Sequence, residues 1–447
     1  MTGPPNVIVV LTDDQGYGDL SCMGSDTVRT PHLDRLAARG VRFTNWYANA
    51  PVCSPTRASL LTGRYPRNTG VRSILRGHRT ATGLPSRVPT IARILKDRGY
   101  RTAIFGKWHL GLAPGCRPED HGFDASFGHL AGCIDYYSHI FYWDRSIDPV
   151  HDLWENGHEI WENGSYMTDL ITDRAVRYVR NAHRDGAPFF VYLAYNAPHY
   201  PMHAPDRYLE RFPHLPSDRR TMAAMLSAVD DGIGAVCDEL ARQGSLDNTL
   251  ITFQSDNGPS RETRNWLDGR EDPYYGGSSG GLKGHKSSLF DGGIRVPGII
   301  TWPESIRGGR VLDTPGAAID ILPTILAACG GRPQDYEVDG INLLPHIADN
   351  EPPPERDIFF QFEEQAAVRR GRWKLVRNGR LVENGDVVAP LHLSDLAVDP
   401  GESVNLAAQY PDLVSELERS LDDWSRRLED RWRHEFDQPG SRPVTHQ

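Results

Sequence analysis

The chain has 447 residues, of which 39% are hydrophobic and 24% are charged, and its formal net charge at pH 7 is −10. At this length it can form two domains with sizeable cores. The acidic balance argues against nucleic acid as a partner, because phosphate binding needs a basic face. No run of about 18 apolar residues is present, which argues against a membrane span.

The start of the chain and its cysteines bear on the cellular location of the protein. Only residues 1–6 precede the first predicted strand, which leaves no room for a secretory signal. We therefore expect a cytoplasmic protein, or one whose leader has been removed. Six cysteines are dispersed along the chain: Cys22, Cys53, Cys116, Cys133, Cys237 and Cys329. None forms a Cys-x-x-Cys pair, so we expect reduced thiols rather than a disulfide framework.

Strand and helix signals alternate over most of the chain. Continuous apolar runs are typical of strands buried on both faces of a sheet. They occur at residues 7–11, 101–105, 189–194, 249–254 and 297–302. Capped or amphipathic segments between them predict helices. These cover residues 30–40, 88–99, 167–183, 219–243 and 319–328. The alternation predicts an α/β fold with a large mixed, mostly parallel sheet and helices on both faces.

The pattern changes beyond the prolines at residues 352–354. Strands are expected at residues 358–362, at 367–376 and near 391–393, followed by an amphipathic helix at residues 413–428. We therefore predict a large α/β domain over residues 1–350 and a small C-terminal α+β domain over residues 351–447. The small domain would combine antiparallel strands with one helix and end in a loose tail at residues 438–447.

Two tryptophans fall in this C-terminal region. Trp373 lies in the segment predicted as strands, and Trp424 lies in the predicted helix. Large aromatic side chains usually contribute to a core or an interface. We expect that role for both residues, in preference to a platform for sugar rings.

Oxygen-bearing side chains follow two of the predicted strands. Asp13 and Asp14 come after the first strand, and Asp256 and Asn257 come after the fourth. Adjacent carboxylates repel each other unless a cation lies between them. Open α/β sheets bind ligands at the carboxyl ends of their strands. If both strands belong to one parallel sheet, the four side chains form an oxygen shell suited to Ca²⁺ or Mg²⁺ rather than zinc. Considered separately, each site has an alternative interpretation without a metal: an Asp-Asp turn for the first and an Asn-Gly turn for the second.

Cys53 begins the sequence Cys-Ser-Pro-Thr-Arg, which is followed by small residues and then Leu-Thr-Gly-Arg. Alone, this cysteine would be a small buried hydrophobe. The motif resembles the signature of the type I sulfatases, in the alkaline phosphatase superfamily. In that family the cysteine is oxidised to formylglycine (3-oxoalanine), whose hydrated aldehyde is the nucleophile. The resemblance implies this role for Cys53, with Arg57 close to the attacking hydroxyl. It also implies a formylglycine-generating enzyme as a partner during maturation.

A second motif, Gly-Lys-Trp-His-Leu-Gly at residues 106–111, resembles another sulfatase signature. The resemblance implies that Lys107 binds the sulfate and that His109 serves as a base near the nucleophile. If both residues lie on the preceding strand, their side chains point to the same face. The alternative is a surface lysine beside a structural histidine.

A third motif, Pro-His-x-Pro, follows the strand predicted at residues 189–194. The resemblance places His199 in contact with the ester oxygen. His203 is close in sequence but does not occupy the motif position, and we interpret it as a residue of the rim.

The fourth motif, at residues 282–297, resembles the family segment Gly-Lys-Gly-x-x-x-Glu-Gly-Gly-x-Arg-x-Pro. Counting back from its Gly-Gly pair assigns the family's lysine to Lys286, with Lys283 as the fallback. Two positions depart from the family pattern. Asp291 replaces a glutamate and Ser287 replaces a glycine.

Residues 122–139 resemble the region of arylsulfatases and N-acetylgalactosamine-4-sulfatases in which a serine or histidine borders the sulfate. This likeness assigns substrate contacts to Ser138 and His139. A surface loop without a role in binding is the alternative.

The likeness spans residues 6–406 and implies an alkaline-phosphatase-like fold. It implies hydrolysis of a sulfate monoester, either an aryl sulfate or a sulfated saccharide, to an alcohol and inorganic sulfate. It also assigns metal binding to the four oxygen-bearing side chains. In the implied mechanism, His199 and Lys286 assist the departing oxygen, and His109 accepts the proton whose loss expels sulfate. Two alternatives stay open: a phosphate or phosphonate ester hydrolase of the same superfamily, and an inactive metal- and carbohydrate-binding relative.

Overall fold

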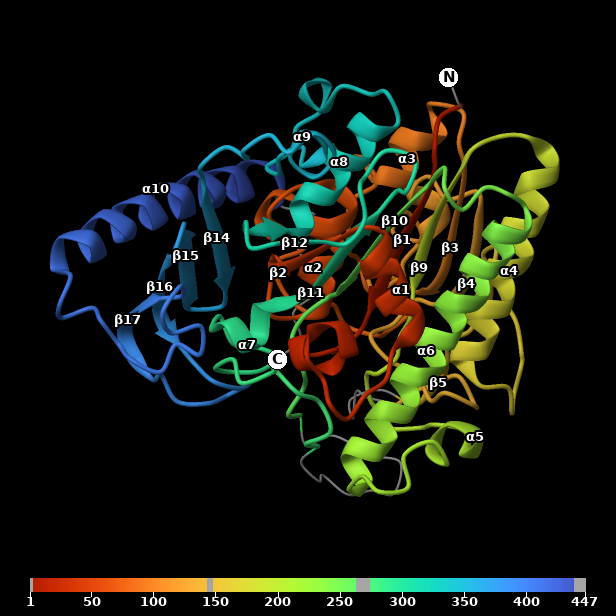
Figure 1. Cartoon of the computed structure of the whole chain (residues 1–447), viewed down its shortest axis with the longest axis horizontal. Helices are drawn as coiled ribbons and strands as arrows, with labels where there is room; N and C mark the ends of the chain where they lie inside the picture. The colour runs from red at the N-terminus through yellow and green to blue at the C-terminus, as the bar shows by residue number, and fades with distance from the viewer. Residues whose placement is uncertain (1–2, 143–147, 263–273, 438–447) are drawn as a thin grey trace.

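A large mixed sheet organises the computed structural model, which describes residues 3–142, 148–262 and 274–437 (Figure 1). Within these residues the sheet has 11 strands, in the order β12-β2-β11-β10-β1-β9-β3-β4-β7-β8, with β13 paired to β2. The parallel centre consists of β10 (Thr249–Ser255), β1 (Asn6–Thr12), β9 (Phe189–Ala194), β3 (Arg101–Lys107) and β4 (Ala125–His129). These strands are buried almost throughout, as their apolar runs predicted.

Antiparallel and short strands complete the sheet on both sides. β11 (Arg295–Thr301) pairs antiparallel with β10 and with β2 (Val41–Tyr47). β12 (Arg310–Leu312) and β13 (Gly316–Ala317) run parallel to β2. At the other edge lie β7 (Trp154–Glu155) and β8 (His158–Glu159), and β5 (Ile140–Phe141) pairs separately with β6 (Val150–His151). The predicted mixed, mostly parallel sheet is confirmed.

Helices flank the sheet in two groups. One group comprises α1 (Pro31–Arg39), α4 (Met167–Asp185), α5 (Asp206–Leu209) and α6 (Ser217–Arg242), with α6 packed against the other three. The second comprises α2 (Cys53–Thr62), α3 (Ile91–Lys96) and α8 (Ile321–Ala328), which pack on one another. Two short helices, α7 (Asp291–Ile294) and α9 (Leu344–Asp349), lie in the later connections. None of the helices in the described ranges has the length and apolar character needed to cross a membrane.

Two helices start at residues other than those predicted from the sequence. The helix predicted at residues 88–99 is shorter, because Thr90 accepts a hydrogen bond from the backbone N–H of Arg93 and α3 starts after it. The last helix is longer than predicted. It begins with a proline at its first position, as α10 (Pro411–Glu435).

A second, antiparallel sheet forms the C-terminal part of the molecule. Its strands are β14 (Asp357–Phe362), β15 (Gln365–Arg370), β16 (Trp373–Gly379) and β17 (Ala389–Asp395), paired in chain order. The segment predicted as strands at residues 367–376 divides into β15 and β16, because the chain turns at Gly371, where φ is 55°. α10 packs on β15 and β16, and Figure 1 shows it along the side of the small sheet. The tail predicted at residues 438–447 lies outside the described residues.

The small sheet is joined to the large domain through aromatic side chains. Trp424 of α10 stacks on Phe359 at a centroid separation of 4.9 Å and meets Tyr65 edge-on at 5.1 Å. Trp373 is half-buried and lies 5.1 Å from the ring of Tyr410. Trp424 thus contributes to a core that includes residues of both parts of the chain.

A buried ion network also joins the two parts. The Lys374 Nζ on β16 lies 2.6 Å from an Asp291 carboxylate oxygen and 3.1 Å from one of Glu402, and all three side chains are fully buried. The backbone N–H of Asp291 donates to the Glu402 carboxylate at 2.6 Å. Burial raises the pKa of Glu402 to about 7, whereas Lys374 and Arg295 hold the pKa of Asp291 below its usual range against the effect of burial. One lysine thus compensates two carboxylates.

Replacing Lys374 with methionine is expected to lower the free energy of unfolding by about 3–5 kcal/mol, because it leaves buried carboxylates without their cation. Arg377→Met is a control on the same strand, since Arg377 pairs with Asp422 at 2.7 Å near the surface and should contribute about 1 kcal/mol or less. Urea unfolding of both variants measures the difference. Equal losses in the two variants would contradict this account of the network.

Candidate active site

The carboxyl ends of β10, β1, β9 and β3 meet at one edge of the large sheet, and most of the predicted site residues lie there. Thr12 is in register with Ser255, so Asp13 and Asp256 follow neighbouring strand ends. The backbone N–H of Asp13 donates to Ala197 O at 3.2 Å, which ties the end of β1 to the loop that carries His199. The parallel register therefore brings four segments that are far apart in the sequence into one cluster.

The four predicted metal ligands form a connected, fully buried group. The Asp14 N–H donates to Asp256 Oδ1 at 3.1 Å, and Asn257 Nδ2 donates to Asp14 Oδ1 at 2.7 Å. Burial raises the pKa of Asp14 to about 7 and also raises the pKa of Asp256. Asp13 Oδ1 and Asn257 Oδ1 are buried and have no hydrogen-bond partner within the described residues. Orphaned oxygens among buried carboxylates fit a hard divalent cation.

The geometry brings one more side chain to this group. Ligand atoms of Asp13, Asp14 and His199 lie within 4.8 Å of one another. His199 Nε2 is 3.6 Å from Asp14 Oδ2. One carboxylate oxygen of Asp256 is bound to Arg57 instead of facing this group. Asp256 Oδ2 accepts from Arg57 Nε at 3.0 Å and from Nη2 at 2.8 Å. The oxygen set can hold a divalent metal, with His199 at its border.

Three buried cations compensate the carboxylates. Lys107 Nζ lies 2.5 Å from Asp13 Oδ2, and Arg57 Nη2 lies 3.6 Å from the same oxygen. Lys286 Nζ donates to Asp14 Oδ2 at 3.0 Å and lies 3.4 Å from the Glu262 carboxylate. Four carboxylates, counting Asp256, thus face three cations, and a bound divalent ion would make the net formal charge positive. A positive centre suits a singly charged sulfate ester.

Cys53 is the first residue of α2 and is 2% exposed. Thr56 fixes the entry to this helix, since its hydroxyl donates to Ala50 O at 2.9 Å and accepts from the Ala50 N–H. Burial raises the pKa of the Cys53 thiol to about 11, although Lys107 and Lys286 act in the opposite direction. An unmodified thiol here stays protonated at neutral pH and is a poor nucleophile. Its environment therefore does not favour cysteine chemistry.

His109 corrects one expectation about the second motif. β3 ends at Lys107, and His109 has a left-handed backbone with φ of 54°. The two side chains therefore do not alternate along one strand, because the chain has already left the sheet. His109 Nε2–H donates to Leu75 O at 3.0 Å, and Nδ1 has no partner in the described residues. Burial, reinforced by Lys107, lowers its pKa well below the usual value, so the ring is neutral.

His199 and Lys286 form a pair beside Asp14. His199 Nδ1–H donates to Tyr200 O at 2.7 Å, which leaves Nε2 facing Lys286 Nζ at 3.3 Å. Burial and then Lys286 lower the pKa of His199 well below its usual value. Asp14 and Glu262 raise the pKa of Lys286 against the effect of burial. The pair thus combines a neutral imidazole with a protonated amine.

The structure places Lys286, rather than Lys283, at this cluster. Lys283 Nζ donates to Glu402 O at 3.1 Å and lies over the ring of Phe290. Ser287, where the family segment has glycine, has φ of 73°. Glycine adopts that conformation without strain, whereas other residues incur a cost of about 1–2 kcal/mol. Asp14 and His109 share this rare backbone region, and such strain is typical of functional sites.

Ser138 and His139 are not joined to the cluster. The Ser138 N–H donates to the Asp135 carboxylate at 2.6 Å. His139 is buried, and its Nε2–H donates to Ser165 O at 3.2 Å. In the part of the chain that the structure describes, neither side chain bonds to another predicted site residue. Their contact with substrate stays a prediction. The rim residue His203 lies 3.4 Å from the Asp135 carboxylate.

Two residues at the cluster were not predicted from the sequence. His129 is in register with Lys107, is fully buried and has an Nε2 without a partner in the described ranges. Only the pairing of β4 with β3 would have indicated it. Glu262, 3.4 Å from Lys286, belongs to none of the motifs and carries no signal that sequence reasoning could use.

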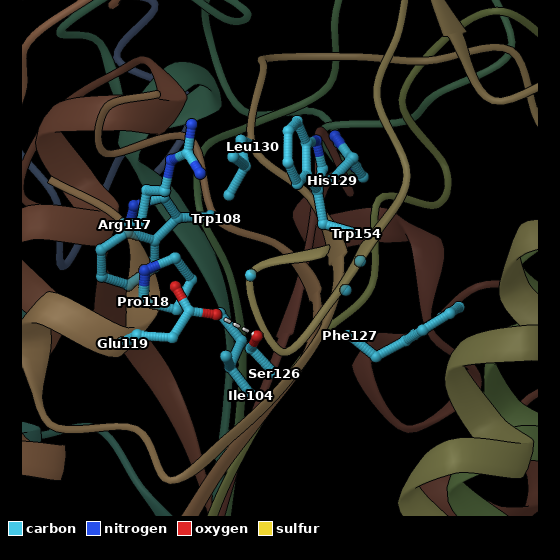
Figure 2. Close-up of a pocket in the computed structure, with 13 residues that line it drawn as sticks. Ile104, Trp108, Arg117, Pro118, Glu119, Ser126, Phe127, His129, Leu130 and Trp154 are labelled. Carbon is cyan, nitrogen blue, oxygen red and sulfur yellow. Dashed lines mark hydrogen bonds between the residues drawn. The ribbon is translucent and has the colours of Figure 1, made fainter. Parts of the chain in front are cut away.

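The pocket in Figure 2 is a different feature. It lies along β3 and β4, where Arg117 is placed over the ring of Trp154 and Ser126 donates to Glu119. Its cavity volume is about 10 Å³, which is about the space of one water molecule. Its lining includes His129 but none of the site residues predicted from the sequence, and it is too small to hold a substrate.

Comparison with known proteins agrees with the geometry. A model of the Sulfatase family matches residues 5–331. Arylsulfatase J of Mus musculus is 32% identical over 95% of this chain and 76% of its own length. N-acetylgalactosamine-6-sulfatase of Rattus norvegicus is 33% identical over 83% of this chain and 71% of its own. The crystal structure of Ps i-CgsB in complex with k-i-k-neocarrahexaose superposes with a TM-score of 0.84 at 32% identity, covering 94% of this chain and 93% of that one.

The chain therefore belongs to the sulfatase family, the sulfuric ester hydrolases of the alkaline phosphatase superfamily. Members of this family generally use formylglycine and a divalent metal. The buried oxygen cluster of this chain fits such a metal.

Removal of divalent cations is expected to lower Tm, because a ligand that binds only the folded state stabilises it. Adding Ca²⁺ at about 100 times its Kd should restore about 2.7 kcal/mol. Asp14→Asn should weaken this response, whereas Asp422→Asn, at a surface pair with Arg377, should keep it. Calorimetric scans with chelator and with Ca²⁺ or Mg²⁺ provide the test. A Tm that changes neither with chelator nor with added ion would rule out the metal site.

Proposed function

We propose that this sulfatase hydrolyses sulfate monoesters of saccharides, with Cys53 converted to formylglycine and Ca²⁺ held by Asp13, Asp14, Asp256 and Asn257. The observation that carries the proposal is the position of the buried Cys53 at the start of α2, close to three buried cations. The names of the relatives support a saccharide substrate, since one is an N-acetylgalactosamine-6-sulfatase and one structure contains a neocarrahexaose. Mg²⁺ is the alternative metal for the same ligands.

The cations explain how an anionic ester is attacked. A sulfate monoester shields its sulfur with negatively charged oxygens, so catalysis needs fixed positive charge around them. Arg57, Lys107 and Lys286 supply it at the head of α2. Formylglycine at position 53 would supply a hydroxyl nucleophile, and the metal would add positive charge at the sulfate oxygens. A formylglycine-generating enzyme is the partner required for this conversion.

The hydrogen-bond directions assign proton roles. His199 donates through Nδ1, so its Nε2 accepts and the proton for the departing oxygen comes from the Lys286 amine, 3.3 Å away. His109 donates through Nε2 to Leu75 O and keeps Nδ1 as an acceptor. A neutral imidazole with a free acceptor nitrogen is suited to act as a base. Both histidines thus offer an acceptor nitrogen, and His199 differs from His109 in that a protonated lysine, Lys286, already faces that nitrogen.

Cys53→Ala is expected to reduce turnover of a sulfate ester by about 10³-fold or more while leaving the free energy of unfolding nearly unchanged, because it removes the nucleophile alone. Cys329→Ala, at a buried cysteine on another part of the fold, is the control and should keep full turnover. Peptide mass analysis should show position 53 converted in active enzyme. Full activity with an unmodified thiol would defeat this mechanism.

Hydrolysis of phosphate esters is the second candidate, and charge distinguishes it. A sulfate monoester carries one negative charge and a phosphate monoester carries up to two at neutral pH. With a divalent ion, the cluster has a small excess of positive charge, which matches the single negative charge of a sulfate monoester better. We expect kcat/KM for nitrophenyl sulfate to exceed that for nitrophenyl phosphate by about 100-fold, equivalent to about 2.7 kcal/mol. The reverse preference would favour the phosphatase alternative.

A further inference from the structure

A larger pocket lies where the chain enters the small antiparallel sheet. Its volume is about 400 Å³, and small-molecule sites usually have about 300–1,000 Å³. Its walls come from the connection between β12 and β13, from Ile341, from the linker before β14 and from the turn between β15 and β16. In the part of the chain that the structure describes, no residue of the catalytic motifs or of the buried charge cluster lines this pocket. It is therefore a feature separate from the proposed active site.

Four arginines line the pocket, and three of them already have a carboxylate partner. Each of these three donates two hydrogen bonds to one carboxylate: Arg356 to Asp320, Arg370 to Asp357, and Arg372 to Asp395. A guanidinium paired in this way has little left to offer to a ligand. The lining also includes Glu355, which is exposed, so water screens its charge.

The fourth arginine, Arg369, is 5% exposed and forms no ion pair with a carboxylate among the described residues. Its Nε donates to Gly371 O at 3.1 Å, and its Nη1 donates to Asn45 Oδ1 at 3.2 Å and to the Tyr47 hydroxyl. The Tyr47 hydroxyl donates in turn to Asp291 at 3.0 Å. Nη2 donates to none of the described residues, so this nitrogen is a charged donor that a ligand in the pocket can use.

Asp291 does not supply the missing negative charge, because other cations already share it. Lys374 Nζ lies 2.6 Å from Asp291 and 3.1 Å from Glu402, and Arg295 lies 3.5 Å from Asp291. Burial raises the pKa of Asp291, but Lys374, Arg295 and Arg369 together hold it below its usual range. Three cations thus face two carboxylates, and one positive charge stays uncompensated.

The rest of the lining is mainly apolar. It includes two isoleucines, a tryptophan and three prolines: Ile341, Ile358, Trp373, Pro315, Pro353 and Pro354. Apolar walls favour the body of an aromatic ligand, and the half-buried Trp373 can pack against its ring. They also oppose a doubly charged phosphate more than a singly charged carboxylate, because the cost of removing an ion from water rises with its charge.

We propose that this pocket binds an aromatic monocarboxylate, whose carboxylate accepts from Arg369 Nη2 and whose ring lies against Ile341 and Trp373. The buried guanidinium without an ion pair and the apolar walls around it carry this inference. The site would bind its ligand whether or not the catalytic cluster hydrolyses a sulfate ester.

Calorimetric titration tests the role of the charge, with 2-naphthoate as the probe and uncharged 2-naphthalenemethanol as its counterpart. The wild type should bind 2-naphthoate about tenfold or more tightly than the alcohol, because only the acid offers a charged acceptor to Arg369. Arg369→Gln should abolish this preference. Arg372→Gln is the matched control and should keep it, since Arg372 is already paired with Asp395. Equal affinity of the wild type for both compounds, or a preference that persists in Arg369→Gln, would contradict the proposal.

A second variant tests the position, because the catalytic cluster is another positive centre that can attract an anion. Thr314 lines the pocket, and Thr314→Trp fills it without removing a charge. This variant should lower the affinity for 2-naphthoate about tenfold or more and leave kcat/KM for nitrophenyl sulfate unchanged. Val311→Trp is the control and should change neither quantity, since Val311 is exposed on the neighbouring β12 and does not line the pocket.

Thr314→Trp also decides the question if Arg369→Gln does not fold, which is a risk because Arg369 holds Asn45 and Tyr47. Binding of 2-naphthoate that Thr314→Trp weakens and Val311→Trp preserves would support the pocket site. Affinity that is unchanged in Thr314→Trp would place the anion elsewhere and overturn it. Absence of saturable binding to the wild type at millimolar 2-naphthoate would overturn it as well.

Discussion

Compensation of buried charge at the carboxyl ends of β10, β1, β9 and β3 is the constraint on which the rest of the structure depends. Four carboxylates and three cations lie there out of water, where an unpaired charge costs several kcal/mol. Parallel register sets the positions of Asp13, Asp14 and Asp256, and α2 and the loop before α7 supply two of the cations.

The small C-terminal sheet contributes residues to this arrangement of charges. Gln365 holds the loop that carries Lys286, and Lys374 neutralises Asp291 at the far end of the same loop. Asp291 stands where the family segment has glutamate, and its shorter side chain is satisfied by Lys374, Arg295 and Tyr47. Through Gln365 the same sheet helps to position Lys286 in the buried cluster.

Sequence reasoning succeeded where a local pattern carries the information. Continuous apolar runs predicted the central strands, because a strand buried on both faces has no polar positions. It was wrong for His109, since strand alternation was extended two residues past the end of β3. It also gave α3 and α10 incorrect starts, because α3 starts after its cap Thr90 and α10 starts at the proline Pro411. Each error falls at an element boundary, where a single side chain or backbone torsion outweighs the periodic pattern.

By itself the sequence determined the α/β class and the motifs that contain the predicted oxygen ligands, Cys53 and the histidines and lysines, because each is encoded in adjacent residues. Only the tertiary structure decided that Lys286 faces His199 and that Glu262 and His129 join the cluster. It also decided that Ser138 and His139 bond to Asp135 and Ser165. The reason is physical. Contacts between segments far apart in the chain depend on strand register and loop packing, and no local spacing records them.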